Sequence, residues 1–180
     1  MENRTILFVD DEEKLLSSLK RVLADEPYNS LFAKSGKEAL EILEREEVHI
    51  IVTDMRMPEM SGLELLRIVK KEYPHIIRLI LSGYADIDTL LGAINQGEIF
   101  RFITKPWKIN EELKTTIRQA IEFYYLHSER EMLMGFIEQI IEGTEPEKIN
   151  FQLIQALISI RKRRLYEWSK KCDLVPSNSQ

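Results

Sequence analysis

The 180-residue chain has little of what would indicate a secreted, membrane-bound or disordered protein. It contains one cysteine, Cys172, so no disulfide can form within it, and no metal-binding spacing includes that thiol. Seven glycines and six prolines are too few to predict long disordered linkers. No apolar run approaches the ~20 residues needed to span a bilayer, and the first apolar run is too short for a signal peptide. These absences predict a cytoplasmic protein with no membrane segment.

The net negative charge argues against extensive binding of nucleic acid by this protein. The formal net charge is −5, with 31% charged and 44% hydrophobic residues, which is ordinary globular usage. The one locally basic segment, residues 161–171, holds six basic residues and one acidic residue. A DNA-binding output would need such a segment. Two C-terminal helices are nevertheless too few for a helix-turn-helix domain, so a solvated or partner-facing helix end is the favoured interpretation.

Short apolar runs alternate with helical patterns over the first 110 residues. The runs that predict strands are Thr5–Val9, Ser30–Ala33, Ile50–Thr53, Ile76–Leu81 and Phe100–Ile103. Between them, apolar residues at helical spacing predict helices over Glu13–Leu23, Lys37–Arg45, Gly62–Lys71 and Asp86–Gln96. This alternation predicts an α/β fold in which a five-stranded parallel sheet is doubly wound, with helices on both faces.

The pattern changes after residue 110, where no further strand signal occurs. Glu111–Glu142 predicts one long helix, and a capping-box pattern predicts a second helix from about Pro146 to Cys172. We therefore expect a domain over 1–125, a helical extension over 126–172 and a flexible tail over 173–180. The long helix would project beyond a domain of this size while carrying many large apolar residues, which predicts a homodimer formed through the C-terminal helices.

Polar residues lie just after four of the five predicted strands. They are Asp10 and Asp11, Asp54, Ser82 and Lys105. Because the carboxyl ends of parallel strands open on one edge of the sheet, these side chains are expected to converge there. Carboxylates held together repel one another, and Mg²⁺, which prefers hard oxygen ligands, would relieve that repulsion. Each residue alone is equally well explained by helix capping, but four matching strand ends together predict a phosphoryl-transfer site.

The sequence closely resembles the response-regulator receiver family over roughly residues 4–125. The motifs that carry the resemblance are Ile-Leu-Phe-Val-Asp-Asp-Glu at 6–12, Ile-Val-Thr-Asp-Met-Arg-Met-Pro-Glu-Met-Ser-Gly at 51–62, Leu-Ser-Gly-Tyr at 81–84 and Phe-Ile-Thr-Lys-Pro-Trp at 102–107. The resemblance implies a flavodoxin-like receiver domain that is phosphorylated by a sensor histidine kinase. It implies Asp54 as the phospho-acceptor, Asp10 and Asp11 as the acidic metal pocket, and the backbone carbonyl of Arg56 as a third protein ligand of Mg²⁺.

The same resemblance implies a switch at the neighbouring strand ends. Ser82 would hydrogen-bond the phosphoryl group and Lys105 would form an ion pair with it. Phe102 stands at the aromatic switch position, which is commonly tyrosine, so a switch anchored by a hydroxyl is not expected. The only chemistry implied is self-catalysed phosphotransfer and slow autodephosphorylation, so the chain is not expected to be an enzyme for a separate substrate.

A narrower similarity leaves alternatives for the output. Segments within 84–107 are similar to receivers that precede HD-GYP cyclic-dinucleotide phosphodiesterase domains and some transcriptional activators. One alternative is a fragment of such a phosphodiesterase, although no histidine follows residue 127; another is a regulator with a basic-helix DNA-binding output. A haloacid-dehalogenase-like phosphatase needs a second aspartate two residues after its nucleophile, and neither Asp10 nor Asp54 has one.

Overall fold

The computed structural model describes residues 4–83, 87–104 and 112–141, together with residues 155 and 158. The chain divides into two compact units, residues 1–125 and 126–180. Of the predicted second helix, only Gln155 and Ile158 are described, and both are helical. The rest of that helix and the tail over 173–180 lie outside the described residues, so the assignment of 126–172 as a helical extension stays a prediction. Within the described part of the chain, no helix has the length and apolar character needed to cross a membrane.

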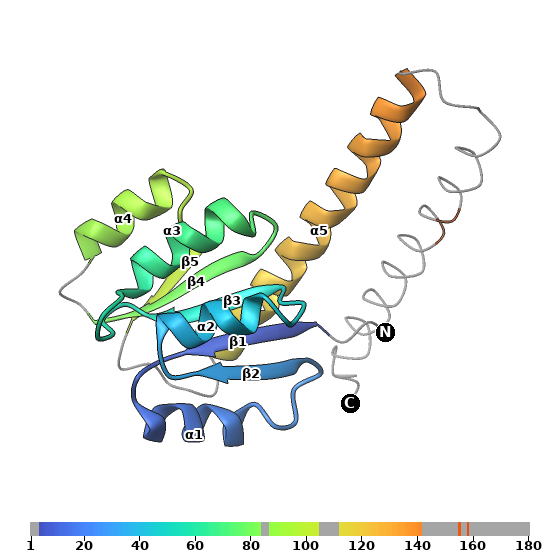
Figure 1. Cartoon of the computed structure of the whole chain (residues 1–180). Coiled ribbons are helices and arrows are strands. Elements are labelled where there is room, and N and C mark those ends of the chain that lie inside the picture. The colour runs from blue at the N-terminus through green and yellow to red at the C-terminus, as the bar shows by residue number, and fades with distance from the viewer. Residues whose placement is uncertain (1–3, 84–86, 105–111, 142–154, 156–157, 159–180) are drawn as a thin grey trace, which may run out of the picture. The chain divides into compact units, whose positions relative to one another are not determined.

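A five-stranded parallel sheet with the strand order β2–β1–β3–β4–β5 is the centre of the first unit (Figure 1). Its strands are β1 (Thr5–Val9), β2 (Asn29–Ala33), β3 (Ile50–Asp54), β4 (Ile77–Ser82) and β5 (Arg101–Thr104). Every strand begins and ends within one residue of its predicted bounds. The predicted fold class, a doubly wound parallel α/β sheet, is therefore confirmed.

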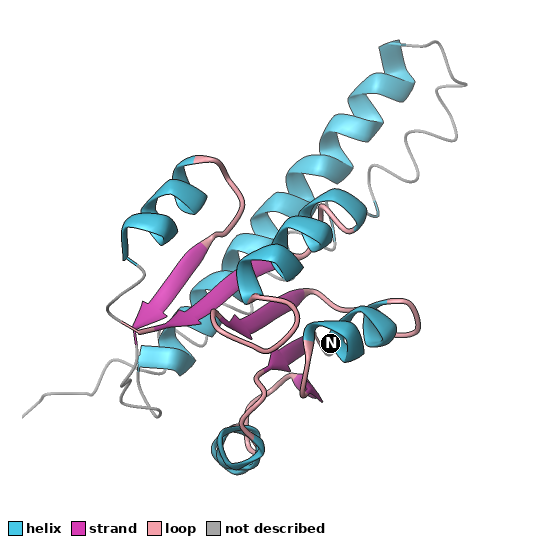
Figure 2. Cartoon of the chain, turned by 60° about the vertical axis from the view of Figure 1, so that its left-hand side comes forward, coloured by secondary structure: helices cyan, strands magenta, loops and turns pink. Residues whose placement is uncertain are grey.

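Helices cover both faces of the sheet (Figures 1 and 2). They are α1 (Glu13–Val22), α2 (Gly36–Leu43), α3 (Gly62–Glu72), α4 (Ile87–Asn95) and α5 (Glu112–Ile141). Helices α2, α3 and α4 pack on one face, and α1 packs with the first turns of α5 on the other. Helix α5 continues without interruption through the boundary between the two units, as the sequence predicted for one long helix.

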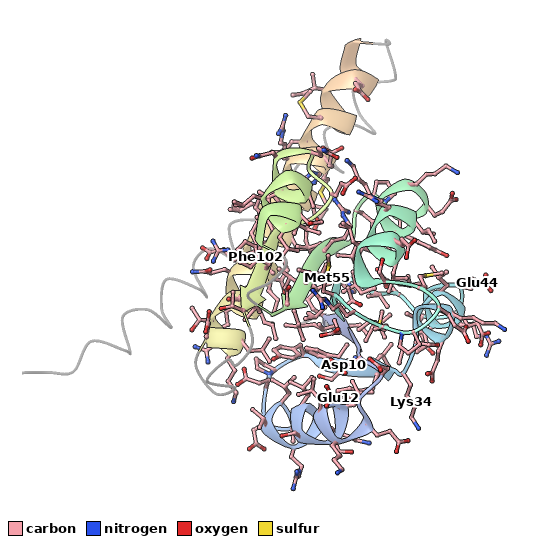
Figure 3. All side chains as sticks on the ribbon, turned by 90° about the vertical axis from the view of Figure 1, so that its left-hand side faces the viewer. Asp10, Glu12, Lys34, Glu44, Met55 and Phe102 are labelled. Carbon is pink, nitrogen blue, oxygen red and sulfur yellow. The ribbon has the colours of Figure 1, made fainter. Side chains whose placement is uncertain are left out.

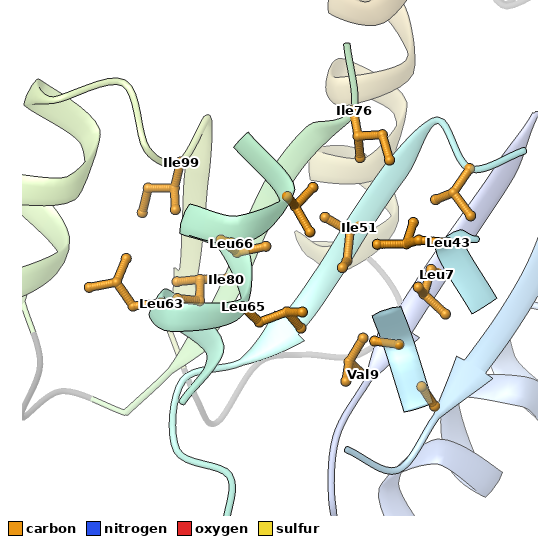
Figure 4. Packing of buried hydrophobic residues seen from close by; sticks show 14 of the residues in the cluster. Leu7, Val9, Leu43, Ile51, Leu63, Leu65, Leu66, Ile76, Ile80 and Ile99 are labelled. Carbon is orange, nitrogen blue, oxygen red and sulfur yellow. The ribbon is translucent and has the colours of Figure 1, made fainter. Parts of the chain in front are cut away.

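Alternate strand residues contribute to two separate apolar clusters. On β1, Leu7 and Val9 face the α2–α4 cluster, which Figure 4 shows in close-up. Ile6 and Phe8 face the α1–α5 cluster. All four are at most 1% exposed, which explains why the central strands are continuous apolar runs in the sequence rather than alternating ones.

Contacts at the amino end of the sheet hold α5 where it leaves the first unit. The guanidinium carbon of Arg4 lies 5.1 Å from the ring centroid of Tyr124 and 4.7 Å from that of Tyr125. The His49 ring meets the Tyr124 ring edge-on, with centroids 5.1 Å apart. Cation–π and edge-to-face contacts of this kind stabilise a packing geometry beyond simple burial. The last turn of α5 within the first unit is therefore fixed to the starts of β1 and β3.

Replacing Leu65 by alanine tests the α2–α4 cluster. Leu65 is 0% exposed on α3, so the Leu65→Ala variant should lose about 2–5 kcal/mol of the free energy of unfolding through lost burial and a residual cavity. Leu91 on α4 is 48% exposed, so Leu91→Ala is the matched control and should change stability by less than about 0.5 kcal/mol. Urea unfolding followed by circular dichroism measures both. Equal stabilities of the two variants would contradict the packing described.

Candidate functional site

Three of the predicted site residues lie at neighbouring strand ends. In the sheet register Val9 pairs with Thr53 and Asp54 pairs with Leu81, so Asp10, Asp54 and Ser82 occupy the same edge. Figure 3 looks onto this edge and labels Asp10, which lies below Met55, the residue that follows β3. Asp10 and Ser82 are 1% exposed and Asp54 is 7% exposed. The structure therefore brings two buried carboxylates and a buried hydroxyl together, as the sequence predicted.

Backbone hydrogen bonds fix the orientation of Asp54. The amide of Arg56 donates to Oδ2 of Asp54 over 2.6 Å, a short bond to a charged acceptor. The amide of Met55 donates to the carbonyl of Leu81 over 2.9 Å, which ties the residue after Asp54 to β4. The Thr53 hydroxyl donates to the Asp54 carbonyl over 3.1 Å. The first bond orients the carboxylate, and the other two hold the backbone around Asp54 at the carboxyl end of β3.

Asp10 has a structural contact as well as its place in the site. Its Oδ1 accepts the amide of Glu12 over 2.8 Å, and Glu12 is the N-cap residue of α1. The backbone amide of Asp10 donates to the carbonyl of Ala33 at the end of β2. Asp10 does not cap α1, since no side chain caps the N-terminal end of this helix, but its bond to the Glu12 amide holds the carboxylate in a fixed place. Asp11, by contrast, is exposed.

The acidic residues suit Mg²⁺ better than an ion that needs a complete protein cage. Within the described ranges, no three His, Cys, Asp or Glu side chains are grouped so that they could hold a metal ion by themselves. Mg²⁺ usually keeps several waters and binds through one or two carboxylates together with carbonyl and phosphate oxygens. The two buried carboxylates of Asp10 and Asp54, with Asp11 exposed beside them, offer that donor set. The carbonyl of Arg56 as a further ligand stays a prediction.

The structure describes the two predicted switch residues, Ser82 and Phe102, but not the predicted phosphoryl-binding Lys105. Ser82 is buried at the end of β4, where its hydroxyl donates to the carbonyl of Gly83 over 3.0 Å. Phe102 is half-buried on β5 and packs against the α2–α4 cluster, which includes Leu90 and Ala93 of α4. Lys105 lies outside the described residues. An aromatic side chain at position 102 thus packs on the face of the sheet that α2, α3 and α4 cover.

The loop from β3 to α3 owes its shape to contacts that periodicity does not reveal. A Cβ added at Gly62 would lie 1.9 Å from the carbonyl oxygen of Asp54, so no larger residue fits there without a shift of the backbone. Glu59 adopts a φ of 64°, which a residue other than glycine seldom does. The Met60 sulfur lies close to Gly36, where an added Cβ would meet it at 2.7 Å. Sequence patterns single out none of these contacts, because each depends on a distant neighbour.

A capping box formed by Ser61 and Glu64 ends the same loop. The Ser61 hydroxyl accepts the Glu64 amide, and the Glu64 carboxylate accepts the Ser61 amide over 2.9 Å. The hydroxyl and amide of Ser61 lower the pKa of Glu64 by hydrogen-bonding its charged form. This box fixes the start of α3 and so the return of the loop to Asp54.

Lys34, at the end of β2, is a cation on this edge that the strand-end pattern did not include. Its ammonium pairs with Glu13 in the first turn of α1, and its amide donates to Glu38 over 2.7 Å. The Lys34 ammonium lowers the pKa of Glu13. Both side chains are well exposed, so this pair contributes little stability. It joins α1 to the β2–α2 loop at the rim of the site.

Comparison with known families agrees with this geometry. The model of the response regulator receiver domain matches residues 6–118. The chain belongs to the response regulator receiver family. It is thus a receiver of a two-component system, and the motifs at 6–12, 51–62, 81–84 and 102–107 fall within the matched range.

Curated relatives of this receiver include a transcriptional regulatory protein and a putative response regulator. The hydrogenase transcriptional regulatory protein HoxA of Cupriavidus necator is 39% identical over 118 residues, which is 66% of this chain and 24% of that protein. The putative response regulator NtrX-like of Rickettsia bellii is 33% identical over 142 residues, 78% of this chain and 29% of that protein. The chain therefore spans about a quarter of the length of these relatives. The expectation that nucleic acid is not a partner stays a prediction.

Solved receiver structures share the fold. The signal receiver domain of an HD domain-containing protein from Pseudomonas fluorescens is 35% identical with a TM-score of 0.65, covering 69% of this chain and 98% of that one. A response regulator receiver domain protein from Clostridium thermocellum is 34% identical with a TM-score of 0.63, covering 68% and 98%. The first of these agrees in part with the predicted similarity to receivers that precede HD-GYP domains.

An alanine at position 62 should damage the site through the backbone. In the Gly62→Ala variant the new methyl group would overlap the Asp54 carbonyl, so we expect a loss of about 1–3 kcal/mol of stability and slower phosphorylation. The control is Gly92→Ala, since a Cβ at Gly92 on α4 meets nothing within 4 Å and alanine favours a helix by about 1 kcal/mol. Thermal unfolding should therefore move in opposite directions for the two variants. Two shifts of the same sign would contradict the close approach described.

Proposed function

We propose that this receiver takes a phosphoryl group from a sensor histidine kinase onto Asp54 with the help of Mg²⁺. The observation that carries the proposal is the placement of Asp54. Its carboxylate is 7% exposed at the end of the central strand β3, is held by the Arg56 amide at 2.6 Å, and lies on the same edge as buried Asp10. A carboxylate that is already fixed in this way loses little conformational entropy when it attacks phosphorus.

The proposed reaction is a displacement at phosphorus. A carboxylate oxygen of Asp54 forms a bond to phosphorus as the bond from phosphorus to the kinase histidine nitrogen breaks, and the electron pair of that bond leaves with the nitrogen. Mg²⁺, when bound, supplies positive charge beside the phosphoryl oxygens. Asp10, Asp11 and the Arg56 carbonyl are the proposed ligands. The Ser82 hydroxyl is proposed to turn from the Gly83 carbonyl toward a phosphoryl oxygen, and Lys105 to pair with another.

The proposed product is an acyl phosphate that water hydrolyses slowly. We do not assign an enzymatic activity on any separate substrate, since the residues at this edge serve their own phosphorylation. Phe102 is proposed to follow Ser82 during the change, because its ring packs against the cluster that includes α4. The output would then be read from the surface near α4, β5 and α5.

A second part of the proposal is that α5 forms a dimer with a second copy of the chain. Phe123, Leu126, Met134 and Ile137 are 41–55% exposed. At 100° per residue they fall within an arc of about 80° on one side of the helix. Apolar stripes of this kind mark an interface rather than a solvated face. A second copy, packed helix to helix, would cover the stripe and place two receivers side by side.

A DNA-directed output is the alternative that the relatives favour. The curated relatives carry names of transcriptional regulators, and this chain corresponds to about a quarter of their length. The basic segment 161–171 would be the contact, and it lies outside the described residues. Salt-dependent binding to a DNA duplex would favour this alternative, because phosphate contacts weaken steeply as salt rises. The phosphodiesterase alternative would require metal-binding histidines that the sequence lacks after residue 127.

The phosphorylation proposal predicts that Asp54 alone is labelled. Incubation with acetyl phosphate and Mg²⁺ should add one phosphoryl group, found on Asp54 by mass spectrometry, and the Asp54→Asn variant should remain unlabelled. Omitting Mg²⁺ should slow labelling by about tenfold or more, because the phosphoryl charge is then less well compensated.

The control is Asp25→Asn, since Asp25 is exposed and belongs to none of the four motifs. This variant should be labelled like the original chain. Full labelling of the Asp54→Asn variant would overturn the assignment of Asp54 as the phospho-acceptor. A labelling rate that is the same with and without Mg²⁺ would overturn the assignment of the ion.

The dimer proposal predicts that charge on the α5 stripe separates the subunits. Sedimentation equilibrium of the full chain at micromolar concentration should report a dimer. The paired substitutions Leu126→Lys and Ile137→Lys should raise the dissociation constant by about tenfold or more, because two ammonium groups would have to be buried with their copies. Glu138→Lys is the control, since Glu138 is exposed on the same helix and outside the stripe. A monomeric chain before and after phosphorylation would exclude the dimer.

A further inference from the structure

The turn between α4 and β5 is held by three basic side chains from neighbouring elements. This turn, residues 96–100, lies at the amino end of the sheet, opposite to Asp54. Arg78, Arg67 and Lys70 each donate at least one hydrogen bond to it. The turn already has backbone hydrogen bonds of its own, so the three basic side chains add to bonds that define its conformation.

Arg78 is the centre of this arrangement. It stands near the start of β4, half-buried, and its guanidinium donates to backbone carbonyl oxygens on two loops. The acceptors are Pro74 at 3.3 Å and Ile76 at 2.7 Å before β4, and Glu98 at 2.8 Å and Gly97 at 3.5 Å after α4. Burial lowers the pKa of Arg78, although the group stays charged. One planar cation therefore joins the loop before β4 to the turn after α4.

Two side chains of α3 add to the same turn. Arg67 Nε donates to Oε1 of Glu98 over 2.9 Å, and Lys70 Nζ donates to the carbonyl of Gln96 over 2.9 Å. The Glu98 side chain is 13% exposed, so its bond with Arg67 is more shielded than an ordinary surface pair. With the bonds from Arg78, each of Gln96, Gly97 and Glu98 accepts from a basic side chain.

The backbone of the turn is itself well defined. Gly97 has a φ of 66°, its amide donates to the carbonyl of Ile94 over 2.9 Å, and the amide of Glu98 donates to the carbonyl of Ala93 over 2.8 Å. These two bonds form the Schellman motif that ends α4. The carbonyls left at the end of a helix carry the negative end of its dipole, so the three cations stand where they are most favourable.

We infer that Arg78, with Arg67 and Lys70, fixes the C-terminal end of α4 so that phosphorylation moves α4 as a lever about residues 96–98. Strand β4 connects the two sites directly, because Arg78 lies four residues before Ser82, about 13 Å along an extended strand. The other end of α4 follows Ser82 in the chain. A change at Ser82 thus reaches the N-terminal end of α4 while its C-terminal end is held. This inference rests on the proposed phosphorylation of Asp54.

Hydrogen exchange of the full chain, followed by mass spectrometry, tests the inference. The variant is Arg78→Met, which keeps an apolar stem and removes the donors. The control is Arg45→Met, since Arg45 is an exposed residue after α2. Without phosphorylation, Arg78→Met should speed exchange of the amides of residues 97–100 by about tenfold or more, while β1 and β3 stay protected. Exchange at these amides equal to that of Arg45→Met would overturn the fixed end.

Addition of beryllofluoride and Mg²⁺ tests the lever. In the original chain, the change in exchange should be confined to the N-terminal half of α4, residues 87–91, and in Arg78→Met it should extend to residues 96–100. A change in the original chain that is equal at both ends of α4 would overturn the lever. Failure of beryllofluoride and of acetyl phosphate to modify the original chain would instead overturn the proposed phosphorylation, and the comparison without phosphorylation would still decide whether Arg78 fixes the turn.

A second variant covers the case in which Arg78→Met does not fold. Arg67→Met removes one side-chain bond to Glu98 at an exposed position of α3, so the fold should persist. It should speed exchange at the same amides by about threefold. No change there in a folded Arg67→Met variant would count against the role of these cations.

Discussion

The burial of two carboxylates at adjacent strand ends is the constraint on which the rest of this receiver depends. Placing Asp10 and Asp54 at 1% and 7% exposure is costly unless hydrogen bonds or a cation compensate their charge. The structure supplies backbone amides, one from Glu12 and one from Arg56. The apolar clusters on both faces of the sheet provide the stability that offsets the burial of these two carboxylates.

The same constraint explains the unusual backbone beside Asp54. The loop must return to the sheet closely enough for Gly62 to touch the Asp54 carbonyl, and Glu59 adopts a left-handed φ on the way. Conformations of this kind cost stability and persist where the surroundings enforce them. Here the capping box of Ser61 and Glu64 enforces the return. The loop therefore trades local stability for a carboxylate of fixed orientation.

Periodicity predicted the strands and the residues at their ends, because both depend on local sequence. Apolar runs fix which segments enter a parallel sheet, and the topology of such a sheet brings Asp10, Asp54 and Ser82 to one edge without further information. Contacts between distant residues could not be predicted in this way. The approach of Gly62 to Asp54 and the bonds of Arg78 to two loops depend on packing distances that no local pattern encodes.

The two ends of the sheet therefore have different mechanical properties. At the amino end, Arg4 holds Tyr124 and Tyr125 of α5, and Arg78 holds the turn after α4. Both cations contact residues at the amino end of the sheet, away from Asp54. At the carboxyl end lie the buried hydroxyl of Ser82 and the carboxylates of Asp10 and Asp54, where the phosphoryl group is proposed to bind. Under the proposed lever, the turn held at residues 96–98 makes the N-terminal end of α4 the end that moves. The apolar stripe of α5 begins at Phe123, whose ring lies 4.6 Å from that of Phe100 beside β5, so the proposed dimer surface begins at a residue that already packs against the segment leading into β5.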